Sequence, residues 1–258
     1  MIRAWQPEVV GIREVLHASF TEHAYPSHTH DTWTLLMVDD GVVAYDLDRH
    51  EHGALRGVVS VLPPGVPHDG RSVTAGGFRK RVLYVEPDVI GADLVGHAVD
   101  HPGISDPALG DGIGHLHQVL AGPHADTFEA DSRLALVVDR LRRHLGPRGA
   151  PRLDPAPALA HRLRSVLDDR VNEPVTLVEV ARELQTSPAH LIRTFGRQFG
   201  ISPHRYLTGR RVERARALLL AGERPSDVAV AVGFHDQSHL TRHFKAMLGV
   251  PPGRFAGV

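Results

Sequence analysis

The last hundred residues of the chain contain an internal duplication, and this duplication restricts the fold more than any other feature of the sequence. Residues 190–195 read HLIRTF and residues 239–244 read HLTRHF. At the same offset of about 49 positions, residues 200–203 read GISP and residues 249–252 read GVPP. Two separate matches at one offset predict two copies of one supersecondary unit, so this part of the chain is expected to fold as a repeated structure.

Helix signals divide each copy into a short helix, a tight turn and a longer helix. Thr176 and Glu179 have the spacing of a capping box, and Ser187 followed by Pro188 is a typical helix start. Apolar spacing predicts a helix that begins near residue 159 and stops before 172. It then predicts helices over residues 176–184, 187–199, 203–220, 225–232 and 237–248. A short helix, a turn and a second helix with a polar face form the helix-turn-helix layout.

Across residues 158–256 this pattern resembles the DNA-binding domain of the AraC/XylS family of bacterial regulators. The matching positions are Ser187, His190, Leu191, Arg193, Phe195, Gly200, Ser202, Pro203, Tyr206, Arg210, Arg211, Ala215, Leu218, Leu219, Val228, Ala229, Val232, Gly233, Phe234, Asp236, Ser238, Phe244, Lys245, Gly249 and Pro251. The resemblance implies that one chain reads two successive major grooves, with recognition helices about 34 Å apart.

The exposed face of each recognition helix is expected to contact DNA. In the first helix we assign Ala189, Ile192, Arg193 and Arg197 to this face, and in the second Ser238, His239, Thr241 and Arg242. Arg193 and Arg242 occupy equivalent positions of the repeat. An arginine in the major groove can pair with guanine, which contributes about 1–3 kcal/mol of discrimination. A phosphate contact or a solvated side chain are the alternatives for either arginine.

Residues 10–85 instead contain short runs that are typical of strands. The runs 34–38, 42–45, 58–62 and 81–85 are each four or five residues long. Turn signals separate them, for example DDG at 39–41 and PPG at 63–65. Short β-rich runs at this spacing predict a sandwich or a small barrel.

Three histidines stand out in this β-rich part. His28 and His30 form a His-x-His motif, and His68 ends the pattern Gly57-x5-Pro63-x-Gly65-x2-His68. The two motifs together resemble the cupin fold, a small β-barrel. Cupin enzymes carry a glutamate a few residues after His-x-His, whereas residues 31–34 read DTWT and contain none.

Three interpretations of His28, His30 and His68 remain open at this point. Neutral imidazoles could bind a divalent metal, as sites with three histidines do. They could line a pocket and form hydrogen bonds with a small organic effector. They could also be remnants of an ancestral metal site with only a structural use. Trp33 and Tyr45 would suit the wall of an effector pocket, although packing in the core is the simpler role for each.

Two further helices are predicted between the β-rich part and the repeat, over residues 106–120 and 126–145. The apolar stripe Leu134, Val138, Leu141 and Leu145 suits a dimer interface or packing on the chain's own barrel. Four prolines within residues 146–157 predict a linker between domains.

The expected fold class is α+β with two domains. Residues 1–100 form a cupin-like effector-binding β-barrel, and residues 101–146 form a helical segment for dimerisation or packing. Residues 147–157 form a Pro-rich linker. Residues 158–258 form an all-α, AraC-type DNA-binding domain with two helix-turn-helix units.

Charge and composition agree with this organisation. Residues 161–258 contain 15 Arg and Lys against 9 Asp and Glu, whereas residues 1–160 contain 14 against 21. A basic C-terminal part favours a nucleic-acid partner. The absence of cysteine excludes a thiol nucleophile, and with it DNA-repair proteins that use a cysteine as methyl acceptor. No signal peptide and no run of about 18 apolar residues is found, so a cytoplasmic protein with no membrane partner is expected.

These features predict a sequence-specific, DNA-binding transcription regulator that is controlled by a small-molecule effector in the barrel and is not an enzyme. The expected partners are double-stranded DNA, the effector, a second copy in a homodimer, and RNA polymerase if the protein is an activator. No cofactor is required, although a divalent metal could occupy the three histidines. The alternative from another class is a metal-dependent cupin enzyme with an appended helical domain.

Overall fold

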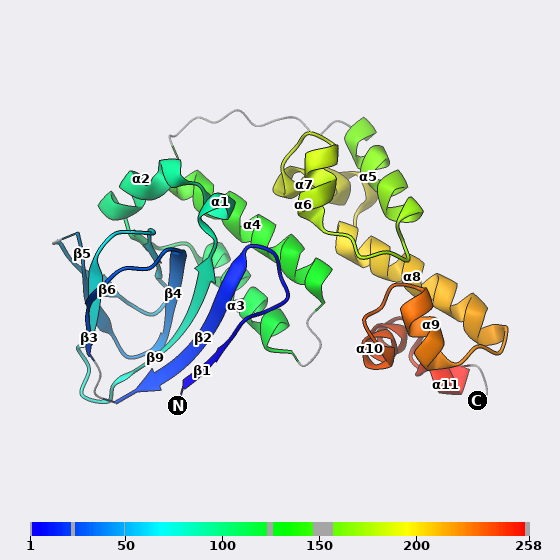
Figure 1. Ribbon diagram of the computed structural model, residues 1–258, viewed down its shortest axis with the longest axis horizontal. Helices are drawn as coiled ribbons and strands as arrows, with labels where there is room; N and C mark the ends of the chain where they lie inside the picture. Colours follow the sequence, from blue (N-terminus) through cyan, green and yellow to red (C-terminus); the bar gives the residue numbers. More distant parts are fainter. Residues whose placement is uncertain (1, 22–23, 49, 123–125, 147–156, 256–258) are drawn as a thin grey trace. The chain divides into compact units, whose positions relative to one another are not determined.

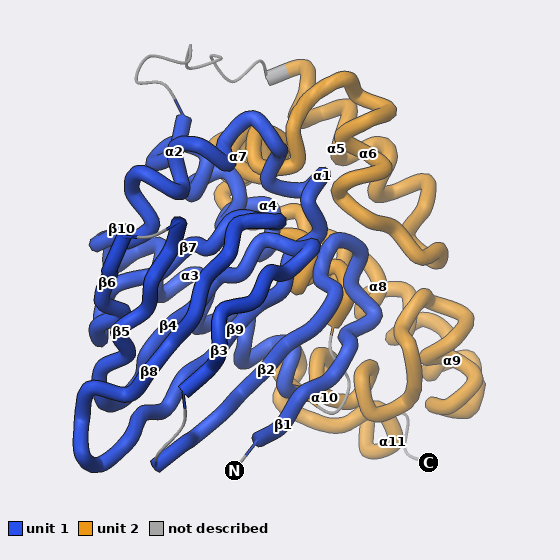
Figure 2. The backbone as a smooth tube through the Cα atoms, turned by 60° about the vertical axis from the view of Figure 1, so that its left-hand side comes forward, with its two compact units in different colours: residues 1–121, 133–151 blue, residues 122–132, 152–258 orange. Residues whose placement is uncertain are grey.

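The chain folds into two compact units. The computed structural model describes residues 2–21, 24–48, 50–122, 126–146 and 157–255. The N-terminal unit contains residues 1–121 and 133–151, and the C-terminal unit contains residues 122–132 and 152–258 (Figure 2). The predicted helical segment 101–146 is therefore divided between the two units. The predicted linker 147–157 lies outside the described residues, apart from Pro157 at the start of a helix.

Two antiparallel sheets form the body of the N-terminal unit (Figure 1). The larger sheet has the order β1-β2-β9-β4-β7-β10. Its strands are β1 (Ile2–Trp5), β2 (Ile12–Phe20), β4 (Trp33–Asp40), β7 (Val59–Leu62), β9 (Phe78–Val85) and β10 (Gly103–Ile104). The smaller sheet has the order β3-β8-β5-β6, with β3 (Ala24–His28), β5 (Val43–Leu47), β6 (His50–Ala54) and β8 (His68–Ser72). The four predicted strands correspond to β4, β5, β7 and β9, of which β5 and β7 begin one residue later than predicted.

The alternation of side chains along the strands creates a core between the two sheets. Leu36 and Val82 from the larger sheet belong to one buried cluster with Tyr45 and Leu47 from the smaller sheet. Because successive side chains of a strand point to opposite faces, the neighbours of Leu36 on β4 face the other side of the larger sheet. That outer face is also buried, since Leu35 is fully inaccessible to solvent.

Helices follow the strands in the N-terminal unit. They are α1 (Pro87–Ile90), the 3₁₀ turn η1 (Ala92–Leu94), α2 (Val95–Asp100), α3 (Pro107–Ala121) and α4 (Thr127–Leu145), whose first turns belong to the C-terminal unit. α3 packs against the larger sheet, because the indole of Trp5 donates a hydrogen bond to the carbonyl of Leu120 at 3.1 Å. The stripe of apolar residues on α4 is buried within the single chain, which favours packing over dimerisation: Leu134, Val138, Leu141 and Leu145.

The C-terminal unit is helical in its described residues. Its helices are α5 (Pro157–Asp169), α6 (Leu177–Glu183), α7 (Pro188–Phe199), α8 (Pro203–Leu220), α9 (Pro225–Ala231), α10 (Gln237–Leu248) and α11 (Pro252–Phe255). α6 and α7 form the first helix-turn-helix, α9 and α10 form the second, and α8 connects them. These helices confirm the predicted ones to within about two residues. No helix among the described residues is long and apolar enough to cross a membrane.

The same local contacts set the ends of both recognition helices. The side chain of Ser187 accepts a hydrogen bond from the N–H of His190 at the start of α7, and Asp236 accepts one from His239 at the start of α10. Gly200 and Gly249 end the two helices in the left-handed conformation, with φ of 73° and 78°. A side chain at these positions would be strained, so the two glycines mark equivalent ends of the repeat.

Candidate ligand cavity and nucleic-acid interface

The structure brings the three predicted histidines of the barrel together. His28 ends β3 and His68 begins β8, and the antiparallel register of these strands makes the two residues direct partners. His30 follows β3 in the loop that leads to β4. The ring centroids lie 4.6 Å apart for His28 and His68, 4.8 Å for His28 and His30, and 5.1 Å for His30 and His68.

Hydrogen bonds orient two of these imidazoles. Nδ1 of His28 lies 2.7 Å from the carbonyl of Pro26, and Nδ1 of His68 lies 3.1 Å from the carbonyl of Val66. Because a carbonyl can only accept, both Nδ1 atoms carry the proton, which leaves each Nε2 as an acceptor or metal ligand. One nitrogen from each of the three histidines lies within 4.8 Å of the others. The set therefore has the donor atoms that a divalent metal or a hydrogen-bonding ligand requires.

Burial favours the neutral form of His30 and of His68. Desolvation, together with the nearby charges of His68 and His28, lowers the pKa of His30 to about 4. Burial also lowers the pKa of His68. Neutral imidazoles at physiological pH suit both roles, because a protonated ring could neither bind a metal nor accept a hydrogen bond.

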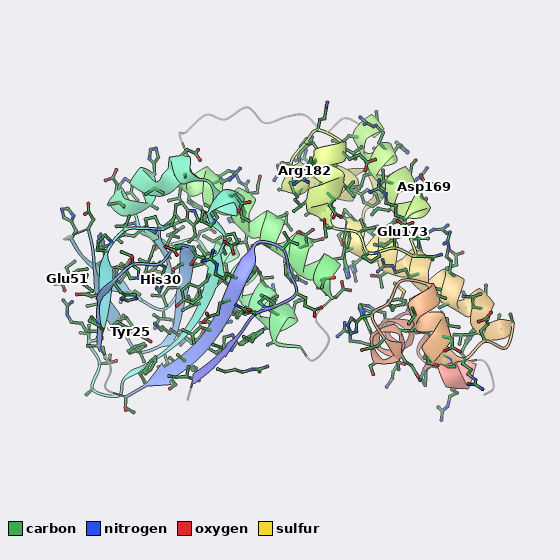
Figure 3. The ribbon with its side chains drawn as sticks, in the orientation of Figure 1. Tyr25, His30, Glu51, Asp169, Glu173 and Arg182 are labelled. Carbon is green, nitrogen blue, oxygen red and sulfur yellow. The ribbon has the colours of Figure 1, made fainter. Side chains whose placement is uncertain are left out.

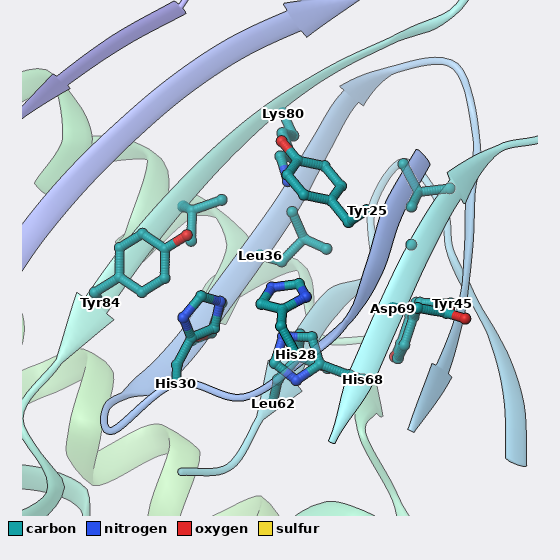
Figure 4. A pocket seen from close by; sticks show the side chains of 14 residues that line it. Tyr25, His28, His30, Leu36, Tyr45, Leu62, His68, Asp69, Lys80 and Tyr84 are labelled. Carbon is teal, nitrogen blue, oxygen red and sulfur yellow. The ribbon is translucent and has the colours of Figure 1, made fainter. Parts of the chain in front are cut away.

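A cavity of about 90 Å³ lies between the two sheets beside the histidines. Tyr25 and His30 are labelled within the barrel in Figure 3, and Figure 4 shows the lining side chains. Tyr45 lines the cavity, whereas Trp33 does not. The prediction that Trp33 forms a pocket wall is wrong, because Thr34 and Leu36 take the inward positions of β4 and Trp33 is fully buried on the opposite face.

Lys80 is the main cavity residue that the sequence analysis missed. It alternates with Val82 and Tyr84 on the inward face of β9, and its ammonium lies 4.1 Å from the ring centroid of Tyr25 (Figure 4). Burial lowers the pKa of Lys80 to about 8 and raises that of Tyr84 to about 12. The sequence contains a signal for this position. Lys80 is one of only two lysines in the chain, and it lies two residues before Val82 in the alternating pattern of the strand.

Three of the eight residues predicted to contact DNA are buried. Ala189, Ile192 and His239 are 3%, 8% and 6% exposed, so the prediction that they lie on exposed faces is wrong. The apolar pair lies on the buried face of α7, where removal from water is favourable. Nε2 of His239 lies 3.3 Å from the carboxylate of Asp126, a residue remote in sequence.

The other five predicted contact residues are accessible in the structure. Arg197, Ser238 and Arg242 are exposed, and Arg193 and Thr241 are partly exposed. Arg193 and Arg242 keep their equivalent positions on α7 and α10.

The arginines of the connecting helix α8 have structural partners. Arg210 forms an ion pair with Asp168 at 3.0 Å. Arg211 is buried and donates two hydrogen bonds of 2.8 Å to the carbonyls of Val171 and Glu173. These contacts tie α8 to α5 and the turn after it, which supports a structural role over a phosphate contact.

A β-barrel with an internal polar cavity and a duplicated helix-turn-helix together define a transcription regulator with a ligand-binding domain. Two family profiles match the chain: one described as "AraC-like ligand binding domain" over residues 11–138 and one described as "Helix-turn-helix domain" over residues 180–257. The chain belongs to the AraC family of transcription regulators.

Relatives of the same type match most of the chain. The chain is 25% identical to the uncharacterised HTH-type transcriptional regulator YbfI of Bacillus subtilis (strain 168), over 84% of this chain and 81% of that protein. It is also 25% identical to the HTH-type transcriptional activator RhaS of Escherichia fergusonii, over 89% of this chain and 86% of that protein. Among solved structures, the C-terminal domain of AraT from Geobacillus stearothermophilus is 30% identical with a TM-score of 0.38, over 41% of this chain and 88% of that one.

Proposed function

We propose that a small-molecule effector binds in the barrel cavity and controls sequence-specific DNA binding by the two recognition helices. The observation that carries this proposal is the cavity itself, which is lined by one ammonium and three imidazoles. Asp69 also lines it, but its carboxylate already accepts the N–H of Asp46 at 2.9 Å. Burial of polar groups is costly unless they have partners, so such a cavity is expected to bind a polar ligand.

The chemistry of the lining favours a small anionic effector. Lys80 offers a positive charge in a buried environment, and Thr34 offers a hydroxyl that has no hydrogen-bond partner in the described part of the chain. His28, His30 and His68 provide acceptors near Tyr84, since the rings of His30 and Tyr84 lie 5.1 Å apart. A compact carboxylate that also carries a hydroxyl would use both groups of partners.

The DNA contacts are proposed for the accessible residues of α7 and α10. Arg193 and Arg242 would reach bases or phosphates from equivalent positions, with Arg197, Ser238 and Thr241 beside them. Phosphate contacts would make binding weaken steeply with salt. Recognition helices that enter successive major grooves require half-sites about 34 Å apart, or one turn of DNA.

The experiment is a selection of bound genomic DNA fragments with the full-length protein, followed by affinity measurements at several salt concentrations. If either arginine reads a base, Arg193→Ala or Arg242→Ala should reduce discrimination at one half-site by about 1–3 kcal/mol. If it contacts a phosphate, the loss should be uniform across sequences. Arg13→Ala is the control, because Arg13 pairs with Glu86 in the N-terminal unit. The proposal is refuted if the protein binds no genomic fragment in a salt-sensitive way.

The remaining parts of the proposal concern assembly and location. We propose a cytoplasmic homodimer that catalyses no reaction of its own. Because the relative RhaS is named a transcriptional activator, contact with RNA polymerase is proposed if this chain also activates. The measured molar mass in solution tests the dimer.

The convergence of three imidazole nitrogens favours a second candidate, a metal-dependent cupin enzyme. His28, His30 and His68 could hold a divalent ion, because two of them already have the carbonyl partners that metal-bound histidines use. Elemental analysis of the protein, compared with a His28→Ala/His30→Ala variant, discriminates between the candidates. A stoichiometric metal that the variant lacks would favour the enzyme, and its absence would favour direct binding of the effector.

A further inference from the structure

A second group of histidines lies in the C-terminal unit, around one carboxylate. Asp126 precedes helix α4, His204 lies in the first turn of α8, and His239 and His243 lie one turn apart on α10. Oδ2 of Asp126 lies 2.7 Å from Nε2 of His204, 3.3 Å from Nε2 of His239 and 3.5 Å from Nε2 of His243. All four residues belong to the unit formed by residues 122–132 and 152–258.

The longer two distances suit shared coordination better than hydrogen bonding. Contacts of 3.3 and 3.5 Å are longer than the usual range for a nitrogen–oxygen hydrogen bond. Ligands that lie about 2.0–2.1 Å from a tetrahedral Zn²⁺ ion are about 3.4 Å from one another. The ligand atoms of Asp126, His239 and His243 all lie within 4.8 Å of each other. The two distances from Asp126 therefore match those between ligands of one ion, and the two histidine ligand atoms lie close enough to share it.

The positions on α10 support the same interpretation. Residues four apart on a helix lie on the same face, and pairs of histidines at this spacing are a recurrent zinc-binding arrangement. The sequence HLTRH at 239–243 places His239 and His243 in this way. At the equivalent positions of α7 the first repeat has His190 and Thr194, so only the second repeat offers both ligands.

The carboxylate is prepared to bind with a single oxygen. Oδ1 of Asp126 accepts the N–H of Glu129 at 3.0 Å and so caps helix α4, which leaves Oδ2 for the histidines. The short contact to Oδ2 makes His204 a hydrogen-bond donor that would orient the carboxylate, as partners outside a coordination sphere do.

The site is buried, and its ligands have few other partners. The side chains of Asp126 and His239 are 9% and 7% exposed. Nδ1 of His239 is buried and has no hydrogen-bond partner among the residues that the structure describes. Nδ1 would carry the proton when Nε2 binds a metal, so the metal bond would satisfy Nε2, whose one contact among the described residues is the long one to Asp126.

We propose that Asp126, His239 and His243 form a binding site for a divalent transition metal, with Zn²⁺ as the best match for two imidazoles and one carboxylate. Three protein ligands leave a fourth position for water. The ion would fix the residue before α4 to the second recognition helix, whose exposed face carries Ser238 and Arg242. Metal occupancy would then stabilise the C-terminal unit and the position of α10 within it.

The test is metal binding to full-length protein that carries no histidine tag and in which His28→Ala and His30→Ala remove the barrel histidines. We expect this background protein to retain one equivalent of Zn²⁺, to show the visible absorption of tetrahedral Co²⁺ after substitution, and to unfold at a higher temperature with Zn²⁺. His243→Thr copies the first repeat and should abolish all three effects. His204→Gln should weaken affinity by about 10–100-fold, as removal of an outer partner does.

Two further variants keep the result interpretable. His235→Gln removes an exposed histidine just before α10 and should bind Zn²⁺ as the background does. Asp126→Asn serves if His243→Thr does not fold, because its amide oxygen can still cap α4. The proposal is overturned if the background protein binds no Zn²⁺, or if His243→Thr and Asp126→Asn both retain full affinity. Either outcome would overturn only the metal site and would leave the proposed binding of an effector in the barrel untouched.

Discussion

Replacement of Lys80 by methionine should stabilise the N-terminal unit at neutral pH. Burial lowers the pKa of Lys80 from 10.5 to about 8, which corresponds to a cost of about 3 kcal/mol for keeping the ammonium charged in the folded state. The ring of Tyr25, 4.1 Å from the ammonium, offsets about 1 kcal/mol of this cost. Methionine keeps most of the apolar stem and has no charge, so Lys80→Met should raise the free energy of unfolding by about 2–3 kcal/mol at pH 7.

The effect should disappear in alkaline solution. Because the folded pKa is lower than the unfolded one, the wild-type protein gains stability relative to the variant as pH rises from 8 towards 10.5. The difference should be at its full value below pH 8 and less than about 1 kcal/mol at pH 10. Both tryptophans of the chain, Trp5 and Trp33, lie in the N-terminal unit, so urea unfolding followed by tryptophan fluorescence reports on this unit.

The chain supplies a matched control for this experiment. Lys245 is the other lysine and is exposed on α10, so Lys245→Met should leave the fluorescence transition unchanged at every pH. Lys80→Met could instead destabilise the N-terminal unit at pH 7, or have an effect that does not depend on pH. Either result would mean that the charged ammonium does not destabilise the folded state, and the argument for an anionic effector would fail. If the argument holds, an anionic effector should stabilise the wild-type protein more than the variant.

Three further predictions concern the C-terminal unit, each measured by the unfolding of its helices in circular dichroism. Arg211→Met should lower stability by about 2–4 kcal/mol, because two buried carbonyls lose their charged donor; a loss under about 1 kcal/mol would contradict this. Burial raises the pKa of Asp131 to about 6. The folded protein therefore loses stability as pH rises from about 4 to 6, because the buried carboxyl group becomes charged. Asp131→Asn should therefore stabilise by about 2–3 kcal/mol at pH 7.5 and by almost nothing at pH 4; equal effects at both would contradict this. Ser187→Ala and Asp236→Ala should each cost about 1 kcal/mol, and no loss from either would refute their role as caps.

Helices of the repeat could be predicted closely because their ends depend on local contacts. The side chains that cap α7 and α10 bond to an N–H three positions along, and the glycines that end them act through their own backbone. Strand β2 was missed because its sequence, IREVLHASF, mixes polar and apolar residues on a strand that is only partly buried. Its pairing with the distant β9 supplies the stability that the local sequence does not indicate.

The candidate sites show the same division between local and long-range information. The three barrel histidines could be predicted because their motifs are short. The position of Lys80 in the cavity depends on the start of β9, three residues before the run that the sequence identified. The burial of His239 could not be predicted, because its partner Asp126 is 113 positions away in the sequence.

The discontinuous composition of the C-terminal unit affects the order in which the chain can fold during synthesis. Residues 122–132 leave the ribosome before the rest of that unit, and His239 follows Asp126 by 113 positions. At a synthesis rate of about 5–20 residues per second, Asp126 waits roughly 6–23 s for this partner. The barrel can close early, whereas the second helix-turn-helix is completed only after Leu248, at the end of α10, has been made. A newly made chain would therefore have a folded ligand-binding domain before it has a complete DNA-binding one.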